Sequence, residues 1–239
     1  MPQSHSIDGN SEAARIRREY ERRDRSIPPD FYAADKAANR FAQGRLAARI
    51  RTLFEQHRLT PLAGRRIADI GCGLGTWLSV FATWGAHPRD LFGIDLSQRR
   101  VATARQRLPH SEIVHGDASR LPWPDVSFDL TCQFTAFSSV LDGPMKKRMA
   151  AEMLRVLRPG GAILWYDLRI NNPRNPAVRA ISLEEITALF PGCAMEAERQ
   201  TLAPPLARAI APRSETVASF LERIPALRSH NLVWIGKPE

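Results

Sequence analysis

The chain has 239 residues, of which 44% are hydrophobic and 25% are charged, and its formal net charge is +9. This composition is typical of a globular protein and excludes collagen-like, intrinsically disordered and membrane-spanning classes. The three cysteines, Cys72, Cys132 and Cys193, lack the paired spacing of a zinc site. We therefore expect reduced thiols and no bound metal.

The N-terminal stretch "MPQSHSIDGN" has neither the basic nor the apolar region of a signal peptide. No segment approaches the roughly 20 apolar residues that a spanning helix requires. We expect a cytoplasmic protein that does not insert into a membrane.

Two helical patterns precede the main domain. Between Ser11 and Arg25, charges of both signs alternate at helical spacing, which predicts an exposed helix. From about Pro29 to His57, apolar residues recur every three or four positions. The sequence thus predicts three parts: a flexible or helical extension over 1–28, a helical lid segment over 29–64 and the main domain over 65–239.

The basic excess is concentrated before the main domain, because residues 31–66 carry eight basic and two acidic side chains. This distribution favours a solvated helix face, with the guidance of an anionic substrate as the alternative.

From Arg65 onward, short apolar runs alternate with helical patterns. Such alternation predicts an α/β fold, in which helices cover a mostly parallel sheet. A capping box of Ser182 and Glu185 marks a late helix. The predicted strands are "RRIADIG", "DLFGIDL", "SEIVHGD", "FDLTCQF", "GGAILWYDL", "AMEAERQTLA" and "HNLVWIGK".

Three glycines, Gly71, Gly73 and Gly75, stand where the first predicted strand passes into a helix. Bare glycine backbone lets a ligand approach closely, and the following helix offers unpaired N–H groups. A dinucleotide fingerprint would require glycine or alanine where Thr76 stands, and a phosphate-binding Walker loop would require a lysine. The spacing therefore disfavours both of these nucleotide sites.

Acidic residues follow the first three strands. Asp69 precedes the glycines, Asp95 ends the second strand, and Asp117 follows the third. One ionised carboxylate can accept two hydrogen bonds from a vicinal diol, so Asp95 is a candidate ribose ligand. The alternative is a helix N-cap, for which Ser97 is better suited.

These features together resemble the class I S-adenosylmethionine-dependent methyltransferases. The resemblance rests on hydrophobic-Asp-hydrophobic-Gly-Cys-Gly-x-Gly, on the later acids and on "LRPGGAILWYD", and it covers residues 65–168. It implies a Rossmann-like, doubly wound sheet of seven strands, mostly parallel with the last one antiparallel, and S-adenosylmethionine as cofactor. The segment after residue 164 is similar to a small bacterial subgroup of methyltransferase type 11, which is related to the ubiquinone and menaquinone biosynthesis methyltransferases.

The resemblance also assigns cofactor contacts to strand ends. The expected residues are Asp69, Gly71, Cys72, Gly73 and Gly75 for methionine and ribose, Asp95 and Leu96 for ribose and adenine, Asp117 and Ala118 for the purine edge, and Gln133 for the sulfonium. Cys72 is expected to be a wall residue, because methyl transfer needs no thiol nucleophile.

For the acceptor side, Tyr166 and Asp167 are candidates to polarise or deprotonate a hydroxyl. The alternative is that Tyr166 fills the core and that Asp167 pairs with Arg169. Several aromatic residues form either an acceptor wall or plain core. These are Trp123, Phe134, Phe137 and Trp165.

Two further segments are open to a functional or a structural interpretation. The pre-core helix with Tyr32, Arg40, Phe41 and Arg45 is a candidate lid, and solubility is the alternative role of its arginines. The asparagines in "INNPRNP" suit a hydroxyl-rich ligand or, equally, shape turns.

The sequence predicts an enzyme that methylates a small-molecule acceptor, most readily a hydroxyl oxygen of a sugar, glycan precursor or natural product. N-methylation of a small metabolite and non-catalytic binding of S-adenosylmethionine are the alternatives. No nucleic-acid partner is expected, because "QFTAF" follows the fourth strand where base-modifying enzymes carry Asn/Asp-Pro-Pro-aromatic. A homodimer is left open.

Overall fold

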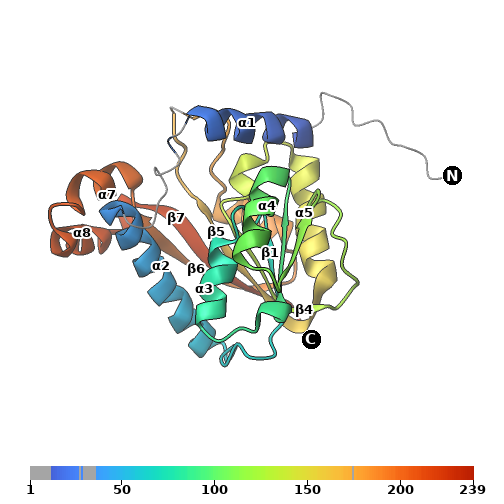
Figure 1. Ribbon diagram of the computed structural model, residues 1–239. Coiled ribbons are helices and arrows are strands. Elements are labelled where there is room, and N and C mark those ends of the chain that lie inside the picture. Colours follow the sequence, from blue (N-terminus) through green and yellow to red (C-terminus); the bar gives the residue numbers. More distant parts are fainter. Residues whose placement is uncertain (1–11, 27, 29–35, 174) are drawn as a thin grey trace.

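The computed structural model describes residues 12–26, 28, 36–173 and 175–239. Seven strands form one sheet in the order β3-β2-β1-β4-β5-β7-β6 (Figure 1). The strands are β1 (Ile67–Ile70), β2 (Leu91–Asp95), β3 (Glu112–His115), β4 (Phe128–Phe134), β5 (Leu157–Leu168), β6 (Ala194–Leu202) and β7 (Arg228–Gly236). All neighbouring pairs are parallel except those that β7 makes with β5 and β6. The predicted sheet and its reversed last strand are confirmed.

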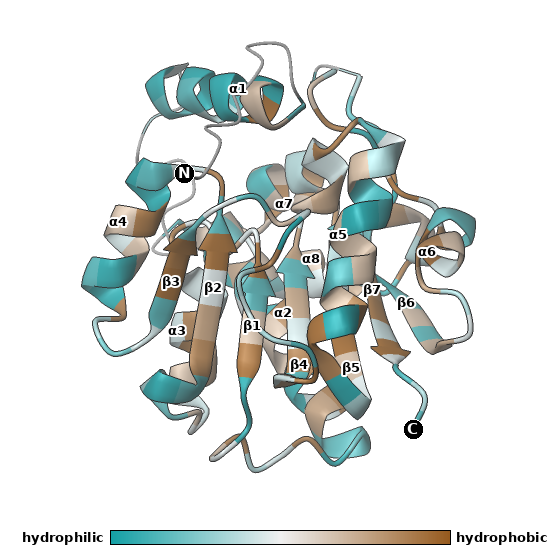
Figure 2. Cartoon of the chain, turned by 90° about the vertical axis from the view of Figure 1, so that its right-hand side faces the viewer, coloured by the Kyte–Doolittle hydropathy of each residue, from teal (hydrophilic) through white to brown (hydrophobic). Residues whose placement is uncertain are grey.

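Helices cover both faces of this sheet. They are α1 (Glu12–Ser26), α2 (Ala37–Gln56), α3 (Thr76–Thr83), α4 (Gln98–Arg107), α5 (Gly143–Val156), α6 (Leu183–Leu189), α7 (Pro204–Ile210) and α8 (Glu215–Glu222). Apolar residues of α2, α3 and α4 pack on one face, and those of α5 and α6 pack on the other (Figure 2). The sheet is therefore doubly wound, which is why β1 and β2 are buried along their whole length.

Local capping fixes where these helices begin. The Ser97 hydroxyl accepts from Arg100 N–H, the Asp142 carboxylate from Met145 N–H, and the Ser182 hydroxyl from Glu185 N–H. Each bond satisfies a donor that the first helical turn leaves unpaired. The predicted capping box at Ser182 thus supplies its expected hydroxyl contact.

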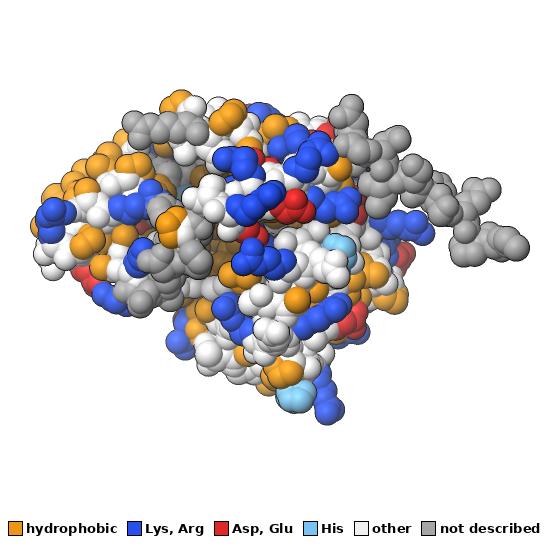
Figure 3. Space-filling view, turned by 45° about the horizontal axis from the view of Figure 1, so that its top comes forward, with side chains coloured by type: hydrophobic (Ala, Val, Ile, Leu, Met, Phe, Trp, Pro, Cys, Tyr) orange, Lys and Arg blue, Asp and Glu red, His pale blue; other side chains and the backbone are white. Residues whose placement is uncertain are grey.

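The first helix departs from expectation. Ile16 of α1 is only 3% exposed and joins the core cluster beneath it. The expectation of an exposed helix over Ser11–Arg25 is therefore wrong for the face of α1 that carries Ile16. The Ile16 side chain and the ring of Tyr20 pack against the sheet. The outer face of α1 does carry charge, as Figure 3 shows.

The described part of the predicted lid segment packs beside the sheet. Phe41 is buried in a small cluster with α7, and Ile50 and Phe54 are buried in the core. Arg45 donates to Glu222 and Arg49 to Glu198 through their Nε atoms. Tyr32 lies outside the described residues, and the division at residues 28 and 64 stays a prediction.

None of the helices within the described ranges combines the length and the hydrophobicity needed to cross a bilayer. In the same ranges, no three His, Cys, Asp or Glu side chains are grouped as metal ligands.

We predict that Trp165 is a principal contributor to stability. It is fully buried on β5, and its ring centroid lies 4.5 Å from Phe137 and 5.8 Å from Phe190. Trp165→Ala should lower the free energy of unfolding by about 3 to 5 kcal/mol. Trp165→Phe should cost less, because it keeps a ring and removes an indole N–H that has no partner among the described residues. Urea unfolding checks this, and equal losses for the two variants would contradict it.

Candidate functional site

A cavity lies at the carboxyl ends of β1 and β2, under α1. Its walls are mainly apolar and include Leu96, Ala118 and Met149, while Asp95 supplies a carboxyl group. An apolar slot with one carboxyl group suits a flat base joined to a sugar diol.

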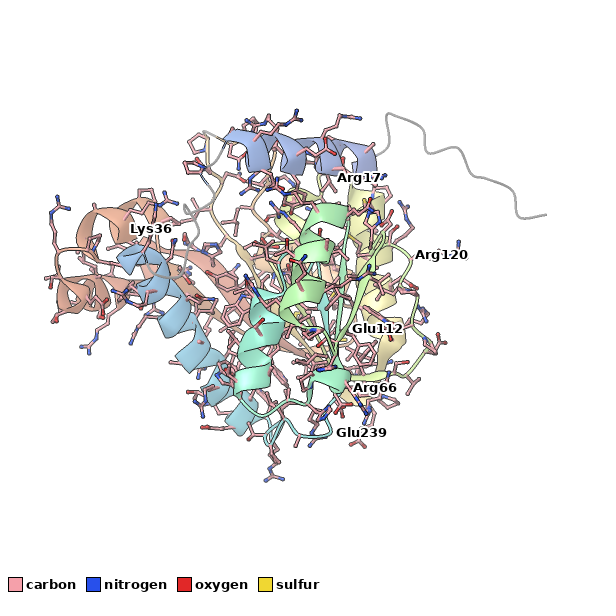
Figure 4. All side chains as sticks on the ribbon, in the orientation of Figure 1. Arg17, Lys36, Arg66, Glu112, Arg120 and Glu239 are labelled. Carbon is pink, nitrogen blue, oxygen red and sulfur yellow. The ribbon has the colours of Figure 1, made fainter. Side chains whose placement is uncertain are left out.

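Figure 4 places Arg66 and Glu112 at the opposite edge of the sheet from α1 and Arg17. There, Arg66 N–H donates to the Asp129 carboxylate, and the indole N–H of Trp123 donates to Glu112. The charged groups at the amino-terminal ends of the strands therefore stabilise the fold.

The glycine loop after β1 leaves bare backbone at the cavity. Gly71 has a φ of +77°, and a Cβ there would lie 2.6 Å from the Cβ of Ala136. Gly73 has a φ of +53° and faces open space, with no atom of another residue within 4 Å of the point that a Cβ would occupy. Both positions require glycine, the first for packing and conformation and the second for conformation. Of the two, Gly71 lines the cavity.

Asp95 joins the glycine loop to the end of β2. One of its carboxyl oxygens accepts from Gly73 N–H at 2.9 Å and the other accepts from Ser97 N–H at 2.8 Å. Ser97 itself caps α4, so the N-cap role that was the alternative for Asp95 is filled by Ser97. Burial raises the pKa of Asp95, which is 6% exposed. Each oxygen keeps a lone pair, so the group can still accept from two hydroxyls.

Asp69 lies behind the glycine loop rather than on the cavity wall. It is 2% exposed, and its Oδ1 has no partner among the described residues. Burial, with the charge of Asp95 as a second cause, raises the pKa of Asp69 to about 8. A buried carboxyl group with one unpartnered oxygen is suited to a cationic neighbour, which the ammonium of a methionine tail would provide. Burial also raises the pKa of the Cys72 thiol, and Cys72 does not line the cavity, so its expected role as a wall residue stays a prediction.

The remaining predicted residues divide into cavity wall and support. Asp117 accepts from Ser119 N–H at 2.8 Å, and the Gln133 side chain accepts from Ala136 N–H and donates to Tyr166 O. These contacts shape the loops that follow β3 and β4. Of the ten predicted cofactor residues, four line the cavity, namely Gly71, Asp95, Leu96 and Ala118, and the other six lie beside or behind it. Their cofactor contacts stay predictions.

Sequence reasoning missed the contribution of α1 to the cavity. Ile16 and Tyr20 line it, and the Tyr20 hydroxyl donates to Ser139 Oγ at 3.2 Å. The Arg100 guanidinium lies 4.2 Å from the Tyr20 ring centroid and binds Asp24 at 2.8 Å. The available signal was an apolar residue and an aromatic residue four positions apart in an otherwise charged helix.

A row of rings crosses the same sheet edge beyond the cavity. Trp77 stacks on Phe134 at 4.4 Å between centroids, Phe134 lies 6.3 Å from Tyr166, and Tyr166 stacks on His230 at 4.6 Å. Of the four predicted wall aromatics, only Phe134 is partly exposed, because Trp123, Phe137 and Trp165 are buried in the core.

The two candidate proton acceptors are both buried. The Tyr166 hydroxyl pairs with Thr201 Oγ1 at 2.7 Å, and burial raises its pKa. Asp167 accepts from Ser138 N–H and Leu168 N–H, and burial raises its pKa to about 6. Arg169 donates to Arg228 O, so the sequence-based alternative of an Asp167–Arg169 pair does not describe these contacts.

The asparagine loop after β5 has structural contacts. Asn171 accepts from Ala180 N–H and Asn175 from Ala177 N–H. These bonds are those expected of turn-forming residues.

Comparison with known proteins agrees with this geometry. Residues 67–161 match the family model described as a methyltransferase domain. The chain is 39% identical over 113 residues to a phthiotriol/phenolphthiotriol dimycocerosates methyltransferase of Mycobacterium tuberculosis, covering 46% of this chain and 40% of that protein. It is 35% identical over 124 residues to a demethylmenaquinone methyltransferase of Clavibacter sepedonicus, covering 51% and 47%. The matches thus span about half the length of these relatives or less.

Solved structures share the fold. A putative methyltransferase of Haloferax volcanii, solved with the Trm112 activator, aligns with a TM-score of 0.61 and 21% identity, over 88% of this chain and 97% of that one. The [4+2]-cyclase SpnF aligns with a TM-score of 0.58 and 24% identity, over 80% of each chain. The α/β fold is thus shared with solved methyltransferase structures. Residues 67–161 match a methyltransferase domain, and another relative, 31% identical over 144 residues, is a probable S-adenosylmethionine-dependent methyltransferase of Mycolicibacterium smegmatis. These matches support a class I S-adenosylmethionine-dependent methyltransferase, a class whose cofactor is S-adenosylmethionine.

The buried Asp69 predicts a pH effect on stability. Its folded-state pKa of about 8 lies above the unfolded value of about 3.9, so between these values the folded chain holds the extra proton. The contribution of Asp69 to the free energy of unfolding therefore falls as pH rises through this window. Asp69→Asn removes the titration, so the variant should gain stability relative to wild type between about pH 5 and about pH 8. Urea unfolding across this range tests it, and a pH-independent difference would count against the assignment.

Proposed function

We propose that the protein transfers the methyl group of S-adenosylmethionine to a hydroxyl oxygen of a small molecule. The observation that carries the proposal is the carboxyl group of Asp95, which two backbone N–H groups fix at the wall of an apolar cavity beside bare glycine backbone. When bound, the sulfonium supplies an electrophilic methyl group, and the bond to sulfur breaks with its electron pair left on sulfur.

The residues of the chain contribute position and the exclusion of water. Asp95 would hold the ribose diol, and Leu96 and Ala118 would flank the base. Ile16 and Tyr20 of α1 line the cavity and would shield a bound donor from bulk water. Positioning of this kind supplies much of the rate of a displacement whose electrophile is already activated.

For the acceptor, the row of Trp77, Phe134, Tyr166 and His230 supports a compound with a flat or apolar skeleton. The matched relatives are named for phthiotriol dimycocerosates and for demethylmenaquinone. Both observations favour a hydroxylated natural product or lipid over a sugar. N-methylation and donor binding without catalysis are the competing functions.

A hydroxyl acceptor must lose its proton, and we propose His230 as the group that takes it, beside Tyr166 and Asp167. Ser229 Oγ lies within hydrogen-bond distance of Thr201 O, at 3.4 Å, and of His230 Nδ1, at 2.9 Å. If Ser229 donates to Thr201, it accepts from Nδ1–H, which leaves the lone pair on Nε2. Burial lowers the pKa of His230 to about 4, so the ring is neutral near pH 7.

Calorimetry with S-adenosylhomocysteine tests the donor site. We expect wild type to bind and Asp95→Ala to weaken binding at least about tenfold, since charged hydrogen bonds contribute roughly 1.5 to 3 kcal/mol. Glu55→Ala, at an exposed acid near the end of α2, is the control and should bind as wild type does. Failure of wild type to bind would exclude the proposed function.

Methylation assays with a panel of phenols, quinols and hydroxylated lipids test the proton acceptor. His230→Gln should lower kcat by roughly 10²-fold, the lower end of general-base effects, without weakening donor binding. His110→Gln, at an exposed loop histidine, should leave kcat unchanged. Donor binding with no turnover on any acceptor would support the non-catalytic alternative, and an unchanged kcat in His230→Gln would remove His230 from the chemistry.

A further inference from the structure

The segment between β6 and β7 carries an apolar face that no described element covers. Val217 is 49% exposed, Phe220 is 65% exposed and Ile224 is 42% exposed. Their spacing of three and four residues places them on one side of α8 and its C-terminal extension. We call these three residues the α8 surface.

The other side of α8 accounts for its attachment to the protein. Ala218 is fully buried, Leu221 packs on the cluster that contains Phe41, and Glu222 is 2% exposed. Glu222 accepts from Arg45 Nε at 2.7 Å and from Leu202 N–H at 3.2 Å. These contacts attach the helix to the protein, and the residues of the α8 surface take no part in them. Single exposed apolar residues are ordinary, whereas three neighbours on one helix face indicate a contact surface.

Exposed arginines occur close to the α8 surface in the chain. Arg208, Arg213 and Arg223 are exposed, and within residues 204–224, all of which the structure describes, Glu215 is the sole exposed acid. Figure 3 shows hydrophobic and basic side chains interspersed at this end of the molecule. An apolar face in a segment rich in exposed arginines complements the anionic interface of a lipid bilayer.

The topology places the α8 surface near the end of the sheet where the proposed acceptor site lies. Strand β6 ends at Leu202 and β7 begins at Arg228, and β6 runs parallel to β5 because both are antiparallel to β7. The α7–α8 segment thus leaves and re-enters the sheet at the edge where Tyr166 and His230 lie. A bilayer that contacts α8 would lie beside the proposed acceptor site.

We propose that the α8 surface docks the protein on an anionic lipid bilayer, with Val217, Phe220 and Ile224 entering the interface. The arginines argue against a second copy as the occupant, since a two-fold contact through this face would bring two arginine-bearing segments of like charge together. Docking of this kind needs no spanning helix. It goes beyond the proposed methyl transfer and does not depend on it.

Sedimentation with vesicles tests the docking. Wild type should partition into vesicles of phosphatidylcholine and phosphatidylglycerol at least tenfold more strongly than into phosphatidylcholine alone, and added salt should weaken the partition. The double variant Val217→Ser/Phe220→Ser should lose at least tenfold in partition. The double variant Arg213→Glu/Arg223→Glu should bind anionic vesicles weakly, and added salt should have little effect on its remaining partition. Val126→Ser, 53% exposed at the amino-terminal edge of the sheet, is the matched control and should bind vesicles normally.

Calorimetry and light scattering separate the possible outcomes. All variants should keep wild-type affinity for S-adenosylhomocysteine, which shows that they are folded and that the donor site is independent. If wild type binds anionic vesicles but does not bind S-adenosylhomocysteine, the proposed function is excluded and the docking proposal is still supported. The docking proposal is overturned if wild type ignores anionic vesicles, if Val217→Ser/Phe220→Ser binds them unchanged, or if that variant instead converts a wild-type dimer to a monomer.

Discussion

The carboxyl group of Asp95 is the interaction on which the donor site depends. It accepts from Gly73 N–H and from Ser97 N–H, and so it ties the glycine loop after β1 to the end of β2. Backbone bonds from Gly71 and Cys72 to Ile94 O make the same connection, and the Asp95 side chain adds a charged acceptor to it. The bonds from Gly73 and Ser97 orient the carboxyl oxygens toward the cavity, so one side chain both builds the site and would bind the ligand.

The second constraint is the concentration of buried carboxyl groups at this edge. Asp69, Asp95 and Asp167 are all nearly inaccessible, and burial raises the pKa of each. A fold that buries carboxyl groups in this way gives up stability, which is common where a site is prepared for a ligand. A ligand with a positive sulfonium and ammonium is the chemistry that these groups favour.

The fold itself does not decide the reaction. The [4+2]-cyclase SpnF shares the architecture, so the sheet and donor cavity are compatible with more than methyl transfer. The features on which our acceptor proposal rests are the row from Trp77 to His230 and the α7–α8 segment. These parts lie at one end of the molecule, where an acceptor would meet both the rings and, by our proposal, a lipid surface.

The sequence alone determined the features that depend only on residues close together in the chain. Strand and helix alternation, the capping roles of Ser97 and Ser182, and the glycine loop after Asp69 all follow from short-range patterns, and the structure contains each of them. Only the tertiary structure brought Ile16 and Tyr20 over the cavity and stacked His230 on Tyr166. The first requires a helix to dock on strands far along the chain, and the second requires the antiparallel register of β5 and β7. Such contacts arise from the packing of distant surfaces, which no local periodicity encodes.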